Sequence, residues 1–220
     1  NRLMLYPGMC YLVVNYYNTD PKQTTMPARP NIIQPEEAED QTVRDRLHES
    51  EESWYGDAAF FGAMAHCPEV FENIVATFES FEQGEHIDAD LLELMRLKVA
   101  EVHQCAYCAT VRTLDVQESV RPKEDAIFGD IDETALSRRE YLAVSLAEQL
   151  SKDPHRMTDE FFAQLQDVFT EAEIIEMLLF GSLEVGLDRF CIALELQPTD
   201  DSAYPNEVEY PLENPRPKTE

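Results

Sequence analysis

Two cysteines three residues apart, Cys105 and Cys108, are the residues whose type and spacing best suit chemistry. They form Cys-Ala-Tyr-Cys at the predicted start of a helix, where unpaired N–H groups and a positive partial charge favour a thiolate. Their spacing lets a disulfide close within one turn, so one sulfur can attack an oxidant and the other can resolve the product. In a cytosolic protein such a pair is more often catalytic or metal-binding than structural.

A metal is the rival interpretation of the same segment. His103, Cys105 and Cys108 offer three soft ligands within six residues. A zinc site usually needs a fourth ligand, and the sequence contains no second C-x-x-C and no H-x3-H pair. We therefore expect no metal, and we interpret His103 as a polar helix-end residue or as a base. Cys67 and Cys191 lie in apolar segments and are interpreted as small core residues.

The elements that must position this pair are predicted to be helices, so the fold class is all-α. Apolar residues recur every three or four positions, and Ser137, Thr158 and Thr170 are suited to N-caps. The run after Thr170 is apolar around most of its circumference, which predicts a place at the centre of a bundle or across a subunit interface. We expect a loop over 122–133 and helices over 36–51, 57–65, 68–83, 88–103, from about 105, and over 137–150, 158–169 and 171–196.

The residues around the cysteine pair resemble a known family. Leu-Leu-Glu-Leu-Met-Arg-Leu-Lys-Val-Ala over 91–100, leading into Cys105-Ala-Tyr-Cys108, is similar to the core motif of the alkylhydroperoxidase-like (AhpD-like) branch of the carboxymuconolactone decarboxylase family. The resemblance covers about residues 57–198 and implies an AhpD-like helical bundle with the C-x-x-C at a helix N-terminus. Further similar segments are His66-Cys67-Pro68, Leu136-Ser-Arg-Arg-Glu140, Phe169-Thr-Glu-Ala-Glu-Ile174 and Asp188-Arg-Phe190.

The resemblance also implies roles for individual residues. Cys108 matches the cysteine that attacks the peroxide, and Cys105 matches the one that resolves the sulfenic acid as a disulfide. Glu93 matches a glutamate that takes part in proton transfer. A carboxylate on the apolar helix 88–103 is expected to have a raised pKa and to be able to carry a proton.

Position 112 departs from the family pattern. The family commonly has a histidine four residues after the second cysteine, on the same helical face, where it helps to deprotonate the thiol. This chain has Arg112, and a guanidinium cannot accept a proton near neutral pH. Arg112 could lower the pKa of Cys108 as a fixed charge, or it could pair with Glu93 or with a residue of a neighbouring subunit. Tyr107 could donate a hydrogen bond to a thiolate, or be a packed aromatic.

These observations predict a thiol-dependent peroxidase, a disulfide oxidoreductase that reduces hydroperoxides. It would need no metal and no bound organic cofactor beyond an external dithiol reductant, and the family implies a homo-oligomer, a trimer or hexamer. A non-catalytic redox sensor or oligomeric interaction module is the main alternative, favoured by the missing histidine. A decarboxylase-like enzyme acting on a cyclic lactone is less favoured, because such members generally lack the cysteine pair.

The charge of the chain excludes other classes. Asp and Glu number 44 against 17 Lys and Arg, which gives a formal net charge of -27. Nucleic acids and anionic lipid surfaces attract basic patches, so neither is an expected partner. No stretch reaches the about 18 consecutive apolar residues of a membrane helix. The acidity and the five lysines suggest a high-salt cytoplasm, where salt screens the self-repulsion.

Four regions are expected along the chain. Residues 1–25 hold a single acid and are interpreted as a leader or non-native segment, with a native start at Met26. Residues 26–56 form an N-terminal arm and helix, and residues 57–198 form the AhpD-like helical domain. Residues 199–220 form an acidic, Pro-rich tail, either extended over the body or disordered.

Overall fold

The computed structural model describes residues 28–57, 59–82 and 86–197, and this part of the chain contains helices and no strand. The expected all-α class is therefore confirmed. The expected leader over 1–25 and the expected tail over 199–220 lie outside the described residues. The main helices are α1 (Gln41–Glu49), α2 (Ala59–Met64), α3 (Pro68–Glu82), α4 (Ala89–His103), α5 (Ala106–Thr110), α8 (Arg138–Lys152), α9 (Asp159–Gln166) and α10 (Glu171–Leu194).

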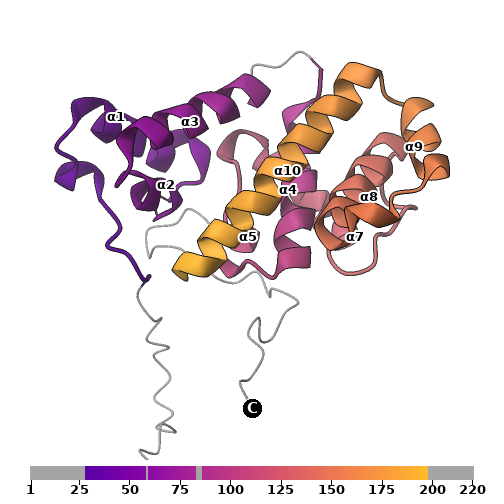
Figure 1. The fold of residues 1–220 in the computed structure, drawn as a ribbon. Helices are drawn as coiled ribbons and strands as arrows, with labels where there is room; N and C mark the ends of the chain where they lie inside the picture. Colours follow the sequence, from indigo (N-terminus) through magenta and orange to yellow (C-terminus); the bar gives the residue numbers. More distant parts are fainter. Residues whose placement is uncertain (1–27, 58, 83–85, 198–220) are drawn as a thin grey trace, which may run out of the picture.

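Helix α4 is the central element of the bundle. Every residue from Leu91 to Ala100 is buried, including three charged ones, because neighbouring helices cover α4 on all sides. Its most extensive neighbours are α8 and α10. In Figure 1, α10 crosses in front of α4, with α8 and α9 on one side and α1 to α3 on the other. The C-terminus of α4 is thus held inside the bundle, where the cysteine pair follows it.

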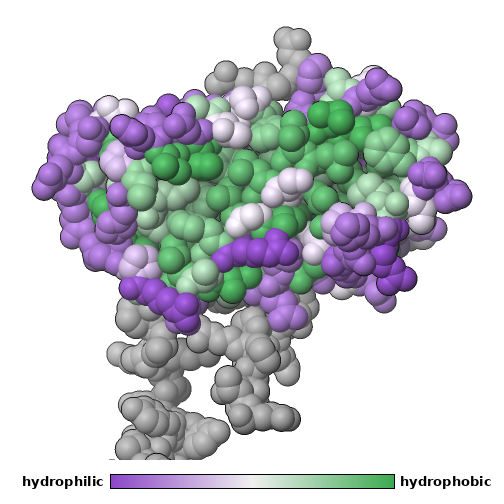
Figure 2. Space-filling view, viewed as in Figure 1, coloured by the Kyte–Doolittle hydropathy of each residue, from purple (hydrophilic) through white to green (hydrophobic). Residues whose placement is uncertain are grey.

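The sequence predicts α10 either at the centre of the bundle or across a subunit interface. The structure shows that it is not at the centre. Ile175 and Leu179 on its outer side are 55% and 61% exposed. Figure 2 shows hydrophobic residues gathered along this face of the molecule, with hydrophilic residues around its edge. The inner side of α10 packs tightly against α8. There is no room for a side chain at Gly181, because a Cβ there would lie only 2.8 Å from the Leu150 side chain of α8. The alternative, a subunit interface, stays a prediction.

Local sequence signals explain where the long helices begin. Ser137 and Thr170 each form a capping box. The hydroxyl accepts from the backbone N–H of the glutamate three residues on, and the carboxylate of that glutamate accepts from the backbone N–H of the Ser or Thr.

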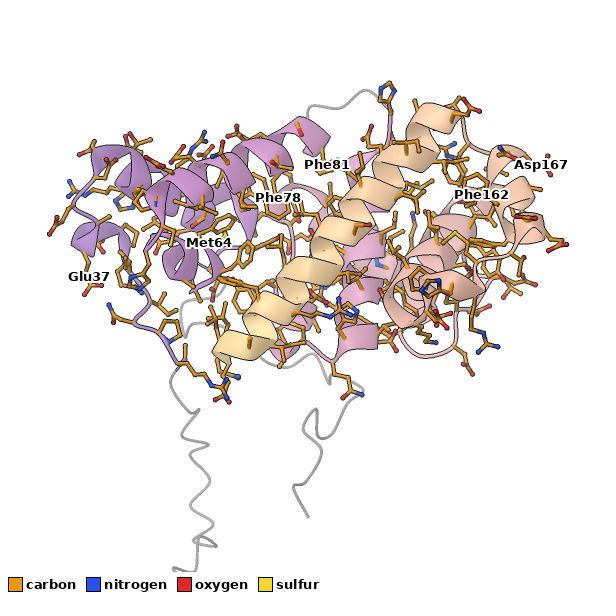
Figure 3. All side chains as sticks on the ribbon, viewed as in Figure 1. Glu37, Met64, Phe78, Phe81, Phe162 and Asp167 are labelled. Atoms are coloured by element: carbon orange, nitrogen blue, oxygen red, sulfur yellow. A yellow bond between two sulfur atoms is a disulfide. The ribbon has the colours of Figure 1, made fainter. Side chains whose placement is uncertain are left out.

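The side of α3 that faces the bundle is aromatic. Phe81 packs edge-on against Phe180 of α10, with 5.4 Å between ring centroids, and Figure 3 shows Phe78 and Phe81 on α3.

The loop expected over 122–133 is partly wrong. A 3-10 turn at Arg121–Lys123 continues into α7 (Glu124–Ile127) before the chain becomes irregular. Lys98 of α4 holds this segment, because its buried ammonium donates to the carbonyls of Ile127 and Gly129 at 2.9 and 2.7 Å. The polar composition of this segment does not reveal that a lysine from a distant helix binds its backbone carbonyls.

Candidate active site

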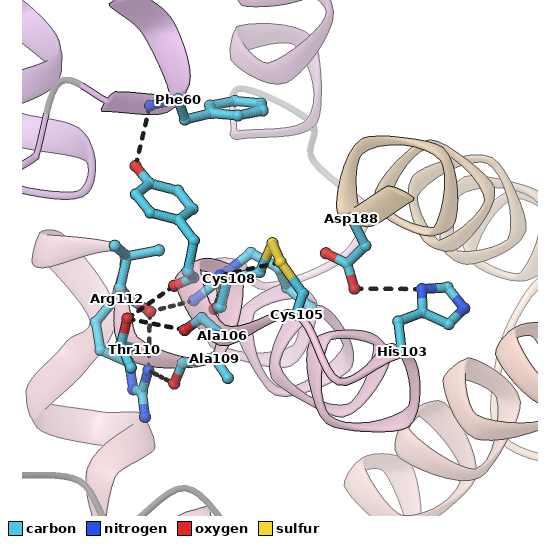
Figure 4. Close-up of a disulfide and its surroundings, with 12 residues drawn as sticks. Phe60, His103, Cys105, Ala106, Cys108, Ala109, Thr110, Arg112 and Asp188 are labelled. Atoms are coloured by element: carbon cyan, nitrogen blue, oxygen red, sulfur yellow. Dashed lines mark hydrogen bonds and ion pairs between the residues drawn. A yellow bond between two sulfur atoms is a disulfide. The ribbon is translucent and has the colours of Figure 1, made fainter. Parts of the chain in front are cut away.

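Cys105 and Cys108 form a disulfide at the end of the central helix. Helix α4 ends at His103, and its C-cap Gln104, with a φ of 58°, turns the chain sharply, so that Cys105 becomes the N-cap of α5. The amide N–H of Cys108 donates to Cys105 Sγ over 3.3 Å. Both cysteines are buried, Cys105 more completely than Cys108. Figure 4 shows the disulfide between α5 and α10.

The helix that follows Cys105 is shorter than expected. Helix α5 has five residues, ends at Thr110 and passes into extended backbone at Val111. A single turn has little macrodipole, so the local amide rather than a long helix is the feature that can stabilise a thiolate here. The early end also means that position 112 does not share a helical face with Cys108, contrary to expectation.

Arg112 points away from the disulfide in Figure 4. Its Nε and Nη2 donate to the two carboxylate oxygens of Glu124 at 2.8 and 3.0 Å. Its Nη1 donates to the carbonyls of Ala109 and Val111. The alternative that Arg112 pairs with Glu93 is therefore wrong, because the guanidinium is engaged by Glu124. Its positive charge is compensated at close range.

Glu93 lies beside the site but in a different state from the one predicted. It forms a two-pronged ion pair with Arg96, with Nη2–Oε1 and Nε–Oε2 distances of 2.6 and 2.7 Å. Thr113 donates to the same carboxylate from its N–H and its hydroxyl. Burial opposes ionisation, but Arg96 and Thr113 outweigh it and hold the pKa of Glu93 below its ordinary value. The expected raised pKa is wrong.

The Glu93–Arg96 pair positions the backbone of the cysteine motif. Arg96 Nη1 donates to the carbonyl of Cys108 and Nη2 to that of Val111, both at 2.8 Å. Both charged side chains are buried, so each requires the other. The expected role of Glu93 in proton transfer stays a prediction, and the contacts make it a carboxylate that holds Arg96 in place.

Tyr107 has its hydroxyl engaged elsewhere. The hydroxyl donates to Asp57 Oδ1 over 3.1 Å and accepts from the backbone N–H of Phe60 over 3.3 Å. Because a phenol has one hydrogen to donate, a bond from Tyr107 to a thiolate would require breaking the one to Asp57. In Figure 4 a dashed line marks the hydrogen bond that the backbone N–H of Phe60 donates. The packed-aromatic interpretation therefore fits these contacts.

His103 lies close to a buried carboxylate of α10. Its Nδ1 is 3.3 Å from Asp188 Oδ2, and its side chain is 9% exposed. Within the described part of the chain, neither ring nitrogen meets the geometry of a hydrogen bond. Burial raises the pKa of Asp188 above its ordinary value, although His103 opposes that effect. Figure 4 shows His103 and Asp188 beside the Cys105–Cys108 disulfide.

Helix α10 contributes three groups whose position beside the cysteine motif the sequence did not reveal. Glu184, Asp188 and Cys191 recur at helical spacing and are all buried on the side of α10 that faces the cysteine motif. Cys191 is buried as expected, but its Sγ and those of Cys105 and Cys108 all lie within 4.8 Å of one another. Cys67 is exposed rather than in the core. Three polar residues at i, i+4 and i+7 of an apolar helix were the available signal.

Glu184 is a second buried carboxyl group of α10 with a raised pKa. Burial raises the pKa of Glu184 from its ordinary value of 4.5 to about 8, with Arg96 opposing and Asp188 and Glu93 adding to the shift. Its Oε1 has no hydrogen-bond partner among the described residues. It lines one small cavity with Cys108, Cys191 and Tyr55, and an adjoining one with Glu93 and Phe180. Glu184 therefore connects the two cavities beside the cysteine motif.

No protein-family model matches the chain, and no curated protein matches it. Solved structures do match its fold. An AhpD-core, uncharacterised peroxidase-related protein from Ralstonia eutropha JMP134 has a TM-score of 0.62 at 17% identity, covering 79% of this chain and 93% of that one. A peroxidase-related protein from Silicibacter sp. TM1040 has a TM-score of 0.65 at 14% identity, covering 84% and 97%.

A third similar structure is a cysteine-to-alanine variant of the debrominase Bmp8 in complex with 2,3,4-tribromopyrrole. Its TM-score is 0.62 at 18% identity, and the match covers 80% of this chain and 95% of that one. All three matches span nearly the whole of the known chain. The protein therefore has the AhpD-like helical fold, with its cysteine pair at disulfide distance.

Proposed function

We propose that this protein is a thiol-dependent peroxidase that reduces hydroperoxides through Cys105 and Cys108. The observation that carries the proposal is the buried disulfide of a C-x-x-C motif with Cys108 lining a small cavity. The likeness of the fold to peroxidase-related proteins supports the same reaction class. No bound cofactor is needed, because two thiols supply both electrons.

The reaction takes two thiol steps. The Cys108 thiolate attacks the terminal oxygen of the hydroperoxide, the O–O bond breaks, and an alkoxide leaves and takes up a proton to form the alcohol. Cys108 is then a sulfenic acid. The Cys105 thiolate attacks its sulfur, a disulfide forms, and hydroxide leaves as water after protonation. An external dithiol reduces the disulfide by thiol–disulfide exchange and completes the cycle.

Glu184 is the proton donor that we propose for the departing alkoxide. It lines the same cavity as Cys108. With a pKa of about 8 it holds its proton at neutral pH, whereas Glu93 is ionised and engaged by Arg96 and Thr113. A neutral acid in the cavity can give a proton to the alkoxide and regain one when the next Cys108 thiol ionises.

The first test is to identify the sulfur that is oxidised. In a reduced Cys105→Ser variant, one equivalent of tert-butyl hydroperoxide should form a sulfenic acid on Cys108, which a dimedone adduct marks for peptide mass spectrometry. A Cys67→Ala variant is the matched control, because Cys67 is the exposed cysteine of the described residues. An adduct found on another cysteine, or no oxidation of the variant, would refute the assignment.

We also propose that the protein assembles as a homo-oligomer in which the outer face of α10 is buried. Ile175, Leu179 and Ile192 are large apolar residues left exposed on that helix. Figure 2 shows a hydrophobic face on the side of the molecule where α10 lies, and burying such a face between copies is favourable. The described residues contain no helix both long and apolar enough to cross a bilayer.

A further inference from the structure

We propose that the reduced protein binds one thiophilic divalent cation, of the zinc class, through Cys105, Cys108 and Cys191. The cation would occupy the position where the three sulfurs converge. Disulfide formation between Cys105 and Cys108 removes two of the ligands, so binding depends on the redox state. The proposal does not require peroxidase activity.

The three sulfurs lie close enough together to share one cation once the disulfide is reduced. Their Sγ atoms all lie within 4.8 Å of one another. A zinc–sulfur bond of about 2.3 Å in a tetrahedron places neighbouring sulfurs about 3.8 Å apart. Opening the disulfide lets its two sulfurs separate toward that spacing, and Cys191 needs a shift of at most about 1 Å. Two ligands come from one turn of chain and the third from α10, an arrangement common in structural zinc sites.

His103 lies beside the three cysteines but is not one of the ligands. It lines a cavity together with Cys105 and Cys191, but its Nδ1 faces the Asp188 carboxylate at 3.3 Å. In Figure 4 the other ring nitrogen is directed away from the disulfide. Three protein ligands and one solvent ligand are a common set for zinc, so the fourth position is left to a solvent ligand that enters through this cavity.

The surroundings suit a cation of this kind. All three cysteines are buried, and water is largely excluded from them. Asp188 and Glu184 add acidic groups on the same side of α10, and the Arg96 charge is compensated by Glu93. Soft thiolate ligands select zinc and similar metals over magnesium and calcium, which prefer oxygen. The many carboxylates of the chain offer oxygen ligands, so they would not compete with the cysteines for a thiophilic cation.

The test is a Co²⁺ titration of the full chain. The protein is reduced with a phosphine, freed of excess reductant under argon, and titrated while the visible spectrum is recorded. We expect saturation at one equivalent, with the intense ligand-field bands of tetrahedral cobalt–thiolate coordination, and displacement of cobalt by Zn²⁺. Oxidation of the dithiol by hydroperoxide should abolish the bands.

Matched variants decide which cysteines bind the metal. Cys191→Ala should weaken Co²⁺ binding by on the order of 100-fold or more, and Cys67→Ala should leave it unchanged. Cys191→Ser keeps the side-chain volume in case the alanine variant is unstable, and circular dichroism checks the fold of each. His103→Gln is a second control and should leave Co²⁺ binding unchanged, because His103 faces Asp188 rather than the sulfurs. Failure of the reduced protein to bind Co²⁺, or equal binding by the Cys191 and Cys67 variants, would overturn the proposal.

Peroxide consumption in the presence of a chelator tests the proposed function separately. The metal proposal fails on the cobalt titration alone, and the peroxidase proposal fails on turnover of the metal-free protein. If both hold, saturating Zn²⁺ should inhibit peroxide reduction, because it engages the Cys108 sulfur. Loss of that inhibition in Cys191→Ala would connect the two results.

Discussion

Glu184 should make the stability of the oxidised protein depend on pH in a way that Glu184→Gln removes. The carboxyl is buried, and burial raises its pKa from 4.5 to about 8. The folded state therefore binds the proton more tightly than the unfolded state does. The stabilisation is fully present below pH 4.5 and is lost as the pH rises toward 8.

The size of the effect follows from the shift. The difference between 4.5 and about 8 is about 3.5 pKa units, or about 5 kcal/mol at 1.36 kcal/mol per unit. Between about pH 5 and pH 8 the linkage relation gives about 3–4 kcal/mol of that total. Burial causes most of the shift, Arg96 opposes it, and Asp188 and Glu93 add to it; these three neighbours are kept in the variant.

The assay is urea unfolding of the oxidised protein at several pH values from 5 to 8, at constant high ionic strength. The free energy of unfolding of the wild type, minus that of Glu184→Gln, should fall by about 3–4 kcal/mol across this range. Glu171→Gln, at an exposed position in the first turn of the same helix, is the control and should follow the wild type. Parallel curves for the wild type and Glu184→Gln would show that Glu184 does not hold a proton in the fold.

Four further predictions concern the surroundings of the site. Glu93→Ala should lower the free energy of unfolding by about 3–5 kcal/mol in urea titrations, because it leaves the Arg96 charge buried and unpaired; a loss below about 1 kcal/mol would contradict this. Arg112→Gln should cost about 1–3 kcal/mol through its lost contacts with Glu124, yet leave the Cys108 thiol pKa unchanged in alkylation-rate titrations of the Cys105→Ser background. A maleimide should label Cys67 in the native protein and Cys191 only after unfolding, as peptide mapping can verify; equal labelling rates would be inconsistent with their burial. Leu179→Glu should reduce the mass measured by light scattering if the outer face of α10 is buried between copies, and an unchanged oligomer would locate the interface elsewhere.

The long helices could be predicted because their signals are local. The capping boxes at Ser137 and Thr170 and the apolar repeat of the segment before Cys105 are contained within single turns. The resemblance around the cysteine pair likewise rests on one contiguous stretch. For the same reason, the all-α class and the AhpD-like fold did not depend on knowing how the helices pack.

The features of the site that the sequence does not predict depend on contacts between distant segments or on the pairing of neighbouring side chains. Cys191 is 83 residues from Cys108, and nothing local brings its sulfur to the disulfide. The raised pKa expected of Glu93 is wrong because Arg96, one turn further along α4, forms an ion pair with it. The helical face expected to join position 112 to Cys108 does not exist, because α5 ends at Thr110 and Arg112 extends toward Glu124.

Multiple-turnover peroxide consumption is the measurement that tests the peroxidase proposal most directly. The metal-free protein is supplied with excess reduced dithiol in high KCl, beside Cys105→Ser and Cys108→Ser variants and the Cys67→Ala control. Many turnovers in the wild type and the control, lost in both site variants, are the expected result. One stoichiometric oxidation followed by no further consumption would contradict the peroxidase and favour a redox sensor that uses the same disulfide.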